Sequence, residues 1–124
     1  MSAKTQILLI DDDEIYLFTA SYSLKRIFPE VEIITSKNGE DALVQLEKSN
    51  PGIVFLDINM PVMDGWEFLD VIMKQQILTG KKIYLVTSSI DPKDRKQAAN
   101  HPMKPIIVEK PLTEEKILEL ELEV

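Results

Sequence analysis

Short runs of consecutive apolar residues alternate along this chain with segments in which apolar residues recur at helical spacing. The two strongest runs cover residues 7–10 and 53–56. A continuous apolar run of this length is typical of a strand that is buried on both faces of a parallel sheet. Weaker runs of the same kind complete the pattern. They predict five strands, over residues 6–10, 31–35, 53–56, 82–86 and 106–108.

Helical spacing of apolar residues fills the intervals between these strands. It predicts five helices, over residues 17–28, 40–48, 64–72, 91–100 and 113–124. Three of them begin with a recognisable capping signal. Asp64 is followed three residues later by Glu67, which is a capping box, Asp91 is followed by Pro92, and Thr113 is followed by two glutamates.

The carboxyl-terminal segment, residues 118–124, carries two conflicting signals. Leucine and glutamate alternate strictly in it, and period-two alternation by itself favours a strand. A helix is nevertheless needed to cover the sheet after the fifth strand. We therefore predict that this segment continues the last helix.

Strands and helices that alternate five times indicate an α/β fold. The expected architecture is a doubly wound, five-stranded parallel sheet of flavodoxin-like order 2-1-3-4-5 with five helices. The chain has 124 residues, which suits one hydrophobic core, and it contains no linker, repeat or low-complexity stretch. The expectation is a single domain over residues 1–124 with no output domain attached.

Charge and composition narrow the classes of partner. The formal net charge is −7, which argues against nucleic acid or an anionic membrane as the main partner. There are no cysteines, so disulfides and thiolate metal sites are excluded. Residues 1–6 lack the apolar core of a signal peptide, and no apolar run approaches membrane-spanning length. A cytoplasmic protein is expected.

Polar side chains follow four of the predicted strands at their carboxyl ends. They are Asp11, Asp12, Asp57, Thr87, Ser88 and Lys110. In the expected strand order these ends lie at one edge of the sheet, where open α/β folds bind ligands. Neighbouring carboxylates repel one another unless a hard divalent cation with oxygen ligands, such as Mg²⁺, lies between them.

The chemistry of this set fits phosphoryl transfer. A carboxylate can attack phosphorus and form an aspartyl phosphate. A metal ion, a lysine and a hydroxyl donor can stabilise the charge on the transferring oxygens. The sequence therefore predicts a Mg²⁺-dependent phosphoryl-transfer site.

Four motifs in this order resemble the receiver domain of two-component response regulators, at the size of a stand-alone, chemotaxis-regulator-like member. They are Ile-Leu-Leu-Ile-Asp-Asp-Asp at 7–13, Phe-Leu-Asp-Ile-Asn-Met-Pro-Val-Met-Asp-Gly at 55–65, Leu-Val-Thr-Ser at 85–88 and Glu-Lys-Pro at 109–111. The resemblance covers essentially the whole chain. It implies a phosphoprotein that assists its own phosphorylation and dephosphorylation and is otherwise no enzyme.

The resemblance also implies a role for each acid. Asp57 would accept a phosphoryl group from a histidine kinase or a histidine phosphotransfer protein, and its carboxylate would contact Mg²⁺. Asp12 would bind Mg²⁺ directly, whereas Asp11 would act mainly through water. The backbone carbonyl of Asn59 would be a further metal ligand.

The remaining motif residues would hold the phosphoryl group. By the same resemblance, Thr87 would hydrogen-bond a phosphoryl oxygen, the backbone N–H of Ser88 would help to hold it, and Lys110 would pair with its charge. The bond between Lys110 and Pro111 would be cis. One position departs from the family, because Ile107 stands where many members carry the Tyr or Phe that moves with the threonine.

The resemblance leaves two roles open, since phosphorylation could switch a surface that binds a separate target protein, or the chain could be a phosphorelay intermediate. Two other classes compete with it. A haloacid-dehalogenase-like phosphatase needs a second acid where this chain has Asn59. An FMN-binding flavodoxin relative would bring a phosphate against Asp11 and its acidic neighbours.

Three aromatic residues lie off the buried face predicted for the first helix. They are Tyr16, Phe18 and Tyr22. Exposed together, they would form a partner surface, and family members meet the helical bundle of the kinase through this helix. Packing against neighbouring loops is the alternative, and both interpretations stay open at this point.

Overall fold

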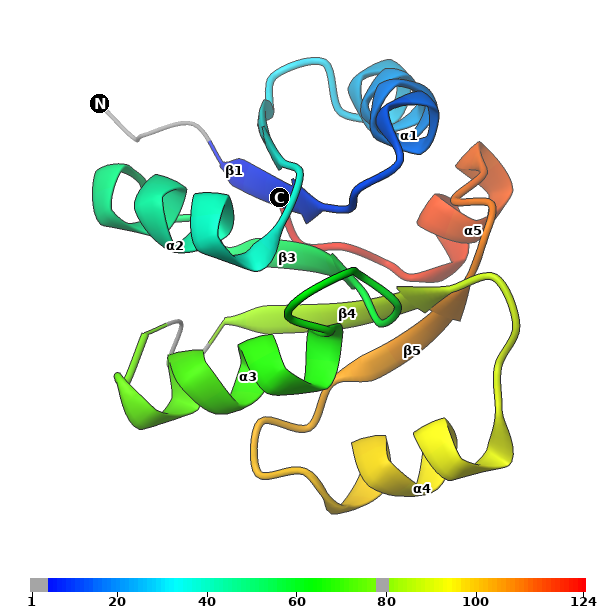
Figure 1. Ribbon diagram of the computed structural model, residues 1–124. Helices are drawn as coiled ribbons and strands as arrows, with labels where there is room; N and C mark the ends of the chain where they lie inside the picture. Colours follow the sequence, from blue (N-terminus) through cyan, green and yellow to red (C-terminus); the bar gives the residue numbers. More distant parts are fainter. Residues whose placement is uncertain (1–4, 78–80) are drawn as a thin grey trace.

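The structure, a computed structural model, describes residues 5–77 and 81–124, so most of the segment 1–6 considered above lies outside the described residues. A central parallel sheet is covered by helices on both faces (Figure 1). Among the described residues, no helix combines the length and apolar character needed to span a bilayer. In chain order the elements are β1 Gln6–Ile10, α1 Glu14–Ile27, β2 Glu32–Ser36, α2 Gly39–Lys48, β3 Ile53–Asp57, α3 Gly65–Lys74, β4 Lys82–Thr87, α4 Pro92–Asn100, β5 Ile106–Glu109 and α5 Glu114–Glu119.

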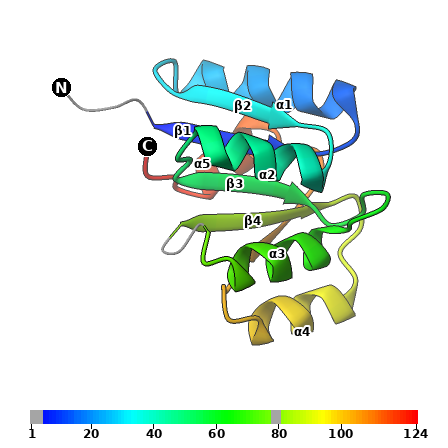
Figure 2. The same cartoon turned by 60° about the vertical axis from the view of Figure 1, so that its left-hand side comes forward.

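The sheet has the predicted order β2-β1-β3-β4-β5, and all its neighbouring strands are parallel (Figure 2). The central strands β1 and β3 are buried almost throughout, as their apolar runs predict. Ile10 at the end of β1 is in register with Leu56 of β3. The residues that follow, Asp11 and Asp57, are therefore neighbours at the carboxyl edge of the sheet.

Two apolar layers hold the helices on the sheet. Alternate residues of each strand point to opposite faces. Side chains of α1 and α5 pack on one face, with Leu17, Leu24 and Ile117 in the core. Side chains of α2 and α3 pack on the other face, with Ala42 and Phe68 among them, and α4 lies on this same side (Figures 1 and 2).

The three predicted capping signals are confirmed, whereas the first helix begins at Glu14 and not at residue 17 as predicted. Asp64, Asp91 and Thr113 each accept a backbone N–H from the first turn of the helix that follows, and Asp64 and Glu67 form the expected capping box. The strand boundaries differ from the prediction by one residue at several ends. In particular, β2 begins and ends one residue later than predicted, because Val31 still belongs to the turn after α1 and donates its N–H to the Phe28 carbonyl.

The prediction that residues 118–124 continue the last helix holds for residues 118 and 119 and is wrong for the rest. Helix α5 ends at Glu119, and Glu121 has a φ of 52°, in the left-handed region that stops a helix. The cause lies in the alternating sequence. Residues two apart point to nearly opposite sides of a helix, whereas the turn lets Leu120 and Leu122 both pack against the α1–α5 layer.

The loop between β3 and α3 returns closely to the strand that it leaves. Gly65 donates its backbone N–H to the Ile58 carbonyl at 2.8 Å. A Cβ added to Gly65 would lie 2.6 Å from the Asp57 carbonyl oxygen and 2.9 Å from the Ile58 Cα. Both are backbone atoms that cannot rotate away, so this glycine permits the close approach that sets the end of β3.

Gly65→Ala is expected to lower the free energy of unfolding by about 2 kcal/mol, because the new methyl group has to displace backbone beside Asp57. Urea unfolding followed by circular dichroism measures the change. Gly52→Ala is the matched control, since a Cβ there meets nothing within 4 Å. Equal destabilisation by the two substitutions would contradict the proposed clash.

Candidate functional site

Three carboxylates from two strand ends meet at the carboxyl edge of the sheet. One oxygen from each of Asp11, Asp12 and Asp57 lies within 4.8 Å of the others. Asp11 is fully buried, Asp57 is 5% exposed and Asp12 is exposed. The backbone fixes both buried acids, because Asp11 donates its N–H to the Ser36 carbonyl at 3.0 Å, and Asp57 Oδ1 accepts the Asn59 N–H at 3.1 Å.

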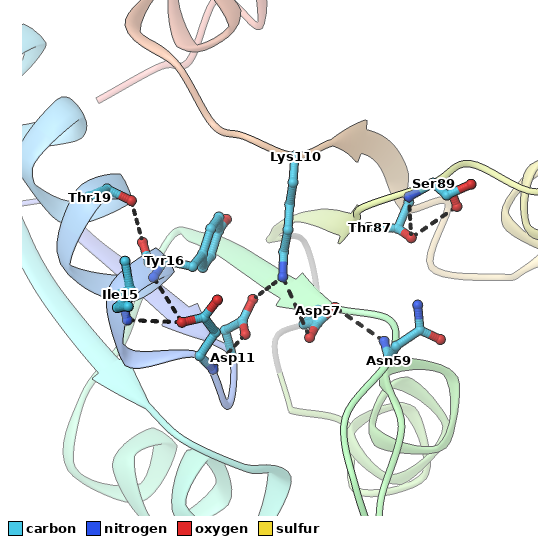
Figure 3. Close-up of polar contacts among 10 residues, drawn as sticks. Asp11, Ile15, Tyr16, Thr19, Asp57, Asn59, Thr87, Ser89 and Lys110 are labelled. Atoms are coloured by element: carbon cyan, nitrogen blue, oxygen red, sulfur yellow. Dashed lines mark hydrogen bonds and ion pairs between the residues drawn. The ribbon is translucent and has the colours of Figure 1, made fainter.

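Lys110 reaches from the end of β5 into this acidic group (Figure 3). Its Nζ lies 2.8 Å from Asp11 Oδ2 and 3.8 Å from Asp57 Oδ2, and its side chain is 19% exposed. The Lys110 N–H also donates to the Thr87 carbonyl at 2.8 Å, which ties the start of this loop to β4. The bond to Pro111 is cis, as the resemblance implies.

The donor set fits a magnesium ion. All three carboxylates offer oxygen, which is the ligand type that Mg²⁺ prefers. Asp11 Oδ2 is buried and accepts no hydrogen bond among the described residues, although Lys110 is close enough for an ion pair. An oxygen in this situation has a lone pair to offer a metal. Asp11, Asp12 and Asp57 are therefore the side chains that could hold Mg²⁺, and the Asn59 carbonyl stays a prediction.

Burial raises the pKa of Asp57 to about 6, and the Asp11 charge adds to this shift. The Lys110 ammonium and the Asn59 N–H act in the opposite direction, because both stabilise the ionised carboxylate. Asp57 is thus an unusually basic carboxylate that is still mostly ionised at neutral pH. A strongly shifted pKa beside other charged groups is a common property of functional sites.

Thr87 and Ser88 follow β4 at the same edge, as predicted, but neither makes a hydrogen bond to Asp57 in this structure. The buried Thr87 hydroxyl is turned towards Ser89, donating to its carbonyl at 3.1 Å and accepting its N–H at 3.3 Å (Figure 3). Ser88 is exposed. The structure therefore brings both residues to the site edge, and their contacts with a phosphoryl group stay a prediction.

The aromatic residues of α1 divide into two groups. Phe18 and Tyr22 are exposed, together with Ile15, which the sequence analysis did not single out. The prediction that Tyr16 lies off the buried face is wrong, because Tyr16 is buried in the same cluster as Leu17 and Leu24. The centre of its ring lies 4.6 Å from Lys110 Nζ. Nothing in the spacing of Tyr16 and Lys110 along the chain indicates this contact.

A family model described as the response regulator receiver domain matches residues 7–120 of this chain. The chain belongs to the response regulator receiver family. This membership confirms the resemblance stated from the sequence motifs, and it favours a signalling domain over the phosphatase and flavodoxin alternatives. Receiver domains bind Mg²⁺ through acidic residues, and this chain brings Asp11, Asp12 and Asp57 together in an acidic group.

The curated relatives are matched over part of their own length. Protein-glutamate methylesterase/protein-glutamine glutaminase 3 of Vibrio cholerae is 41% identical over 73 residues, which are 59% of this chain and 20% of that protein. Protein PilG of Pseudomonas aeruginosa is 29% identical over 83 residues, which are 67% of this chain and 60% of that protein. The chain thus covers less than two thirds of each relative, and the methylesterase match lies in its receiver part.

Solved receiver structures have the same fold over almost the whole chain. A two-component response regulator from Cytophaga hutchinsonii superposes with a TM-score of 0.85 at 30% identity, covering 97% of this chain and 96% of that one. The chemotaxis protein CheY4 of Vibrio cholerae superposes with a TM-score of 0.83 at 24% identity, covering 96% of this chain and 97% of that one. The second likeness concerns the fold alone.

Proposed function

We propose that this receiver domain is a phosphoacceptor in two-component signalling, with Asp57 as the residue that takes the phosphoryl group. The main support for this proposal is the set of groups that surround the Asp57 carboxylate. Its carboxylate is nearly buried, lies beside two other carboxylates and has the Lys110 ammonium 3.8 Å away. This combination provides a nucleophile, a metal-binding group and a fixed cation within one small site.

In the proposed reaction an Asp57 carboxylate oxygen attacks the phosphorus of a phosphohistidine on a kinase or phosphotransfer protein. A P–O bond forms, the P–N bond breaks, and the imidazole leaves with the bonding electron pair. When bound to the acidic group, Mg²⁺ neutralises charge on the phosphoryl oxygens. The Lys110 ammonium then moves partly away from Asp11 and pairs with the phosphoryl group on Asp57. The Thr87 hydroxyl turns from Ser89 towards the same phosphoryl group.

The exposed apolar face of α1 supports docking of the phosphodonor. Ile15, Phe18 and Tyr22 are 76%, 73% and 58% exposed, and their spacing places them on one side of the helix. Ile15 lies in the first turn of α1, next to the acidic group (Figure 3). A helix of the donor packed on this face would bring its phosphohistidine to Asp57.

The surface between α4 and β5 is the region where we expect a downstream target protein to bind. Arg95, Ile106 and Ile107 line a groove between α4 and β5, and Ile106 is exposed. We propose that phosphorylation changes the population of conformations at this surface and so alters binding of a separate target protein. Onward transfer of the phosphoryl group to a histidine phosphotransfer domain would identify a relay intermediate instead.

Incubation with acetyl phosphate and Mg²⁺ is expected to add one phosphoryl group, measured by intact-protein mass spectrometry. Acetyl phosphate is a small donor in which a P–O bond breaks and acetate leaves, so the test needs no cognate kinase. Asp57→Asn removes the nucleophile and should abolish the modification, and a chelator of Mg²⁺ should do the same.

Asp91→Asn serves as the control for this experiment. Asp91 is an exposed N-cap of α4, and asparagine caps a helix equally well, so this variant should be modified like the wild type. A phosphoryl group on the Asp57→Asn variant would show that another residue is the acceptor. Undiminished modification in the presence of the chelator would remove the metal from the proposal.

A further inference from the structure

Tyr16 makes a contact with Lys110 that neither the motifs nor the family match assigns. The Tyr16 ring comes from the first turn of α1, and Lys110 Nζ lies over it at 4.6 Å from the ring centre. The ring is buried, and Figure 3 shows it beside the lysine side chain on the Asp11 side. A lysine ammonium over an aromatic face is attracted by the negative charge density of the ring.

Hydrogen bonds in the first turn of α1 fix the backbone of Tyr16, and its ring is buried. Asp13 caps the helix by accepting the N–H groups of Ile15 and Tyr16 at 3.0 and 3.3 Å. The hydroxyl of Thr19 donates to the Tyr16 carbonyl at 3.1 Å. The ring also belongs to the buried α1–α5 layer. Tyr16 is therefore a rigid wall rather than a mobile surface residue.

Ile107 stands where many family members carry Tyr or Phe, but it cannot hold Lys110 in the way that Tyr16 does. It is paired with Leu85 across β4 and β5 and packs into the opposite apolar layer, together with α3. It also has no ring. Among the described residues, the aromatic side chain recorded in contact with Lys110 is Tyr16, which approaches from α1.

We propose that Tyr16 is a positioning residue that holds the Lys110 ammonium between Asp11 and Asp57. A lysine side chain has several rotatable bonds, and at 19% exposure Lys110 has solvent within reach. The ring opposes movement of the ammonium towards solvent, while the two carboxylates attract it. The effect of Tyr16 on the rate of phosphorylation rests on the function proposed above. Its effect on the position of Lys110 does not depend on that function.

The ring, and not the hydroxyl, carries this role. The Tyr16 hydroxyl is buried and has no hydrogen-bond partner among the described residues. An unpaired buried hydroxyl is unfavourable for stability. The hydroxyl of Tyr16 therefore does not explain the position of the Lys110 ammonium over the ring. Tyr16→Phe and Tyr16→Leu separate the two parts of the side chain, since the first keeps the ring and the second removes it.

The position of Lys110 can be measured without any phosphoryl donor. Protons above an aromatic ring resonate upfield, so the assigned ε-methylene protons of Lys110 should lie upfield of those of the exposed Lys93. The upfield shift should persist in Tyr16→Phe and disappear in Tyr16→Leu. Tyr84→Leu makes the same change in the same apolar layer, where Tyr84 stacks on Phe55, and should leave the Lys110 shift in place.

The kinetic test compares phosphorylation by acetyl phosphate. Tyr16→Leu is expected to slow it about tenfold, the effect of a well-formed cation–π contact, and Tyr16→Phe should restore the rate. In a Lys110→Met background, Tyr16→Leu should cause no further loss, because the ring acts through the lysine. Thermal unfolding of each variant checks that it is folded.

The outcomes separate the two proposals. An unshifted Lys110 in the wild type, or a shift that survives Tyr16→Leu, would overturn the positioning role. Additive losses in the double variant would overturn it too, because they would indicate a general packing effect. If the wild type took up no phosphoryl group while the Lys110 shifts behaved as expected, the proposed function would fail and the positioning role would stand.

Discussion

Replacing Lys110 with methionine is expected to lower the free energy of unfolding by about 3 kcal/mol in the presence of a chelator. Lys110 Nζ lies 2.8 Å from Asp11 Oδ2, and the Asp11 side chain is fully buried. Methionine keeps much of the length and apolar character of the lysine stem but removes the charge. The substitution therefore leaves a buried carboxylate without its cation, next to a second carboxylate at Asp57.

Magnesium should reverse much of this loss. A cation that binds only the folded state adds stability in proportion to the logarithm of its concentration over its dissociation constant. In Lys110→Met the metal no longer competes with an ammonium for Asp11. The variant should therefore gain more stability from saturating Mg²⁺ than the wild type does, as measured by urea unfolding with and without chelator.

Lys37→Met is the matched control for this prediction. Lys37 forms an ion pair of similar length, 2.7 Å, with Glu14, but both side chains are largely exposed. Exposed ion pairs contribute little to stability, so this variant should unfold almost like the wild type and show no added response to Mg²⁺. A loss of equal size in both variants would mean that burial of Asp11 has no part in the effect.

The convergence of the acids with Lys110 was predictable because it depends on backbone direction. Continuous apolar runs identify the buried strands, and parallel strands bring their carboxyl ends to one edge. Asp11 and Asp57 follow from that rule alone, without knowledge of any side-chain conformation. Lys110 follows once β5 is placed at the edge of the sheet next to β4.

The pairing of side chains within the site was not predictable in the same way. The motifs indicate that Lys110 meets a phosphoryl group, but they do not show that its ammonium lies closer to Asp11 than to Asp57. The choice depends on side-chain rotamers and on the wall formed by Tyr16. Spacing along the chain carries no information about a contact between residues so far apart in sequence.

The end of α5 shows a second limit. The need for a helix over the sheet is satisfied by six residues, Glu114–Glu119, and a longer helix is not required. Beyond that point the local alternation of leucine and glutamate decides the conformation, because it lets Leu120 and Leu122 reach the same apolar layer. The need to cover a face of the sheet therefore predicts that a helix is present, but it does not predict where that helix ends.

Asp57→Asn is expected to stabilise the protein by about 2 to 3 kcal/mol at neutral pH in the absence of divalent cation. The unfolded chain loses the Asp57 proton near its ordinary pKa of 3.8, whereas the folded chain keeps it up to a pKa of about 6. Between these values the folded state binds more protons than the unfolded state. Wild-type stability therefore falls as pH rises through this window, and the ionised carboxylate remains a constant cost above it.

Asparagine removes this cost because it stays neutral, and its carbonyl oxygen can still accept the Asn59 N–H. The advantage of the variant should therefore be large at neutral pH and close to zero near about pH 4, where Asp57 is protonated in the folded wild type. Chemical unfolding at both pH values, with Asp91→Asn as the baseline, gives the difference.

At neutral pH, Mg²⁺ should reduce the difference in stability between Asp57→Asn and the wild type. The wild type gains a ligand interaction at Asp57 when the metal binds, whereas the variant has lost one of its three carboxylates. Saturating Mg²⁺ is thus expected to narrow the gap between the two proteins. A gap that is independent of both pH and Mg²⁺ would mean that Asp57 is not ionised against an energetic cost, and its proposed basicity as a phosphoacceptor would lose its physical support.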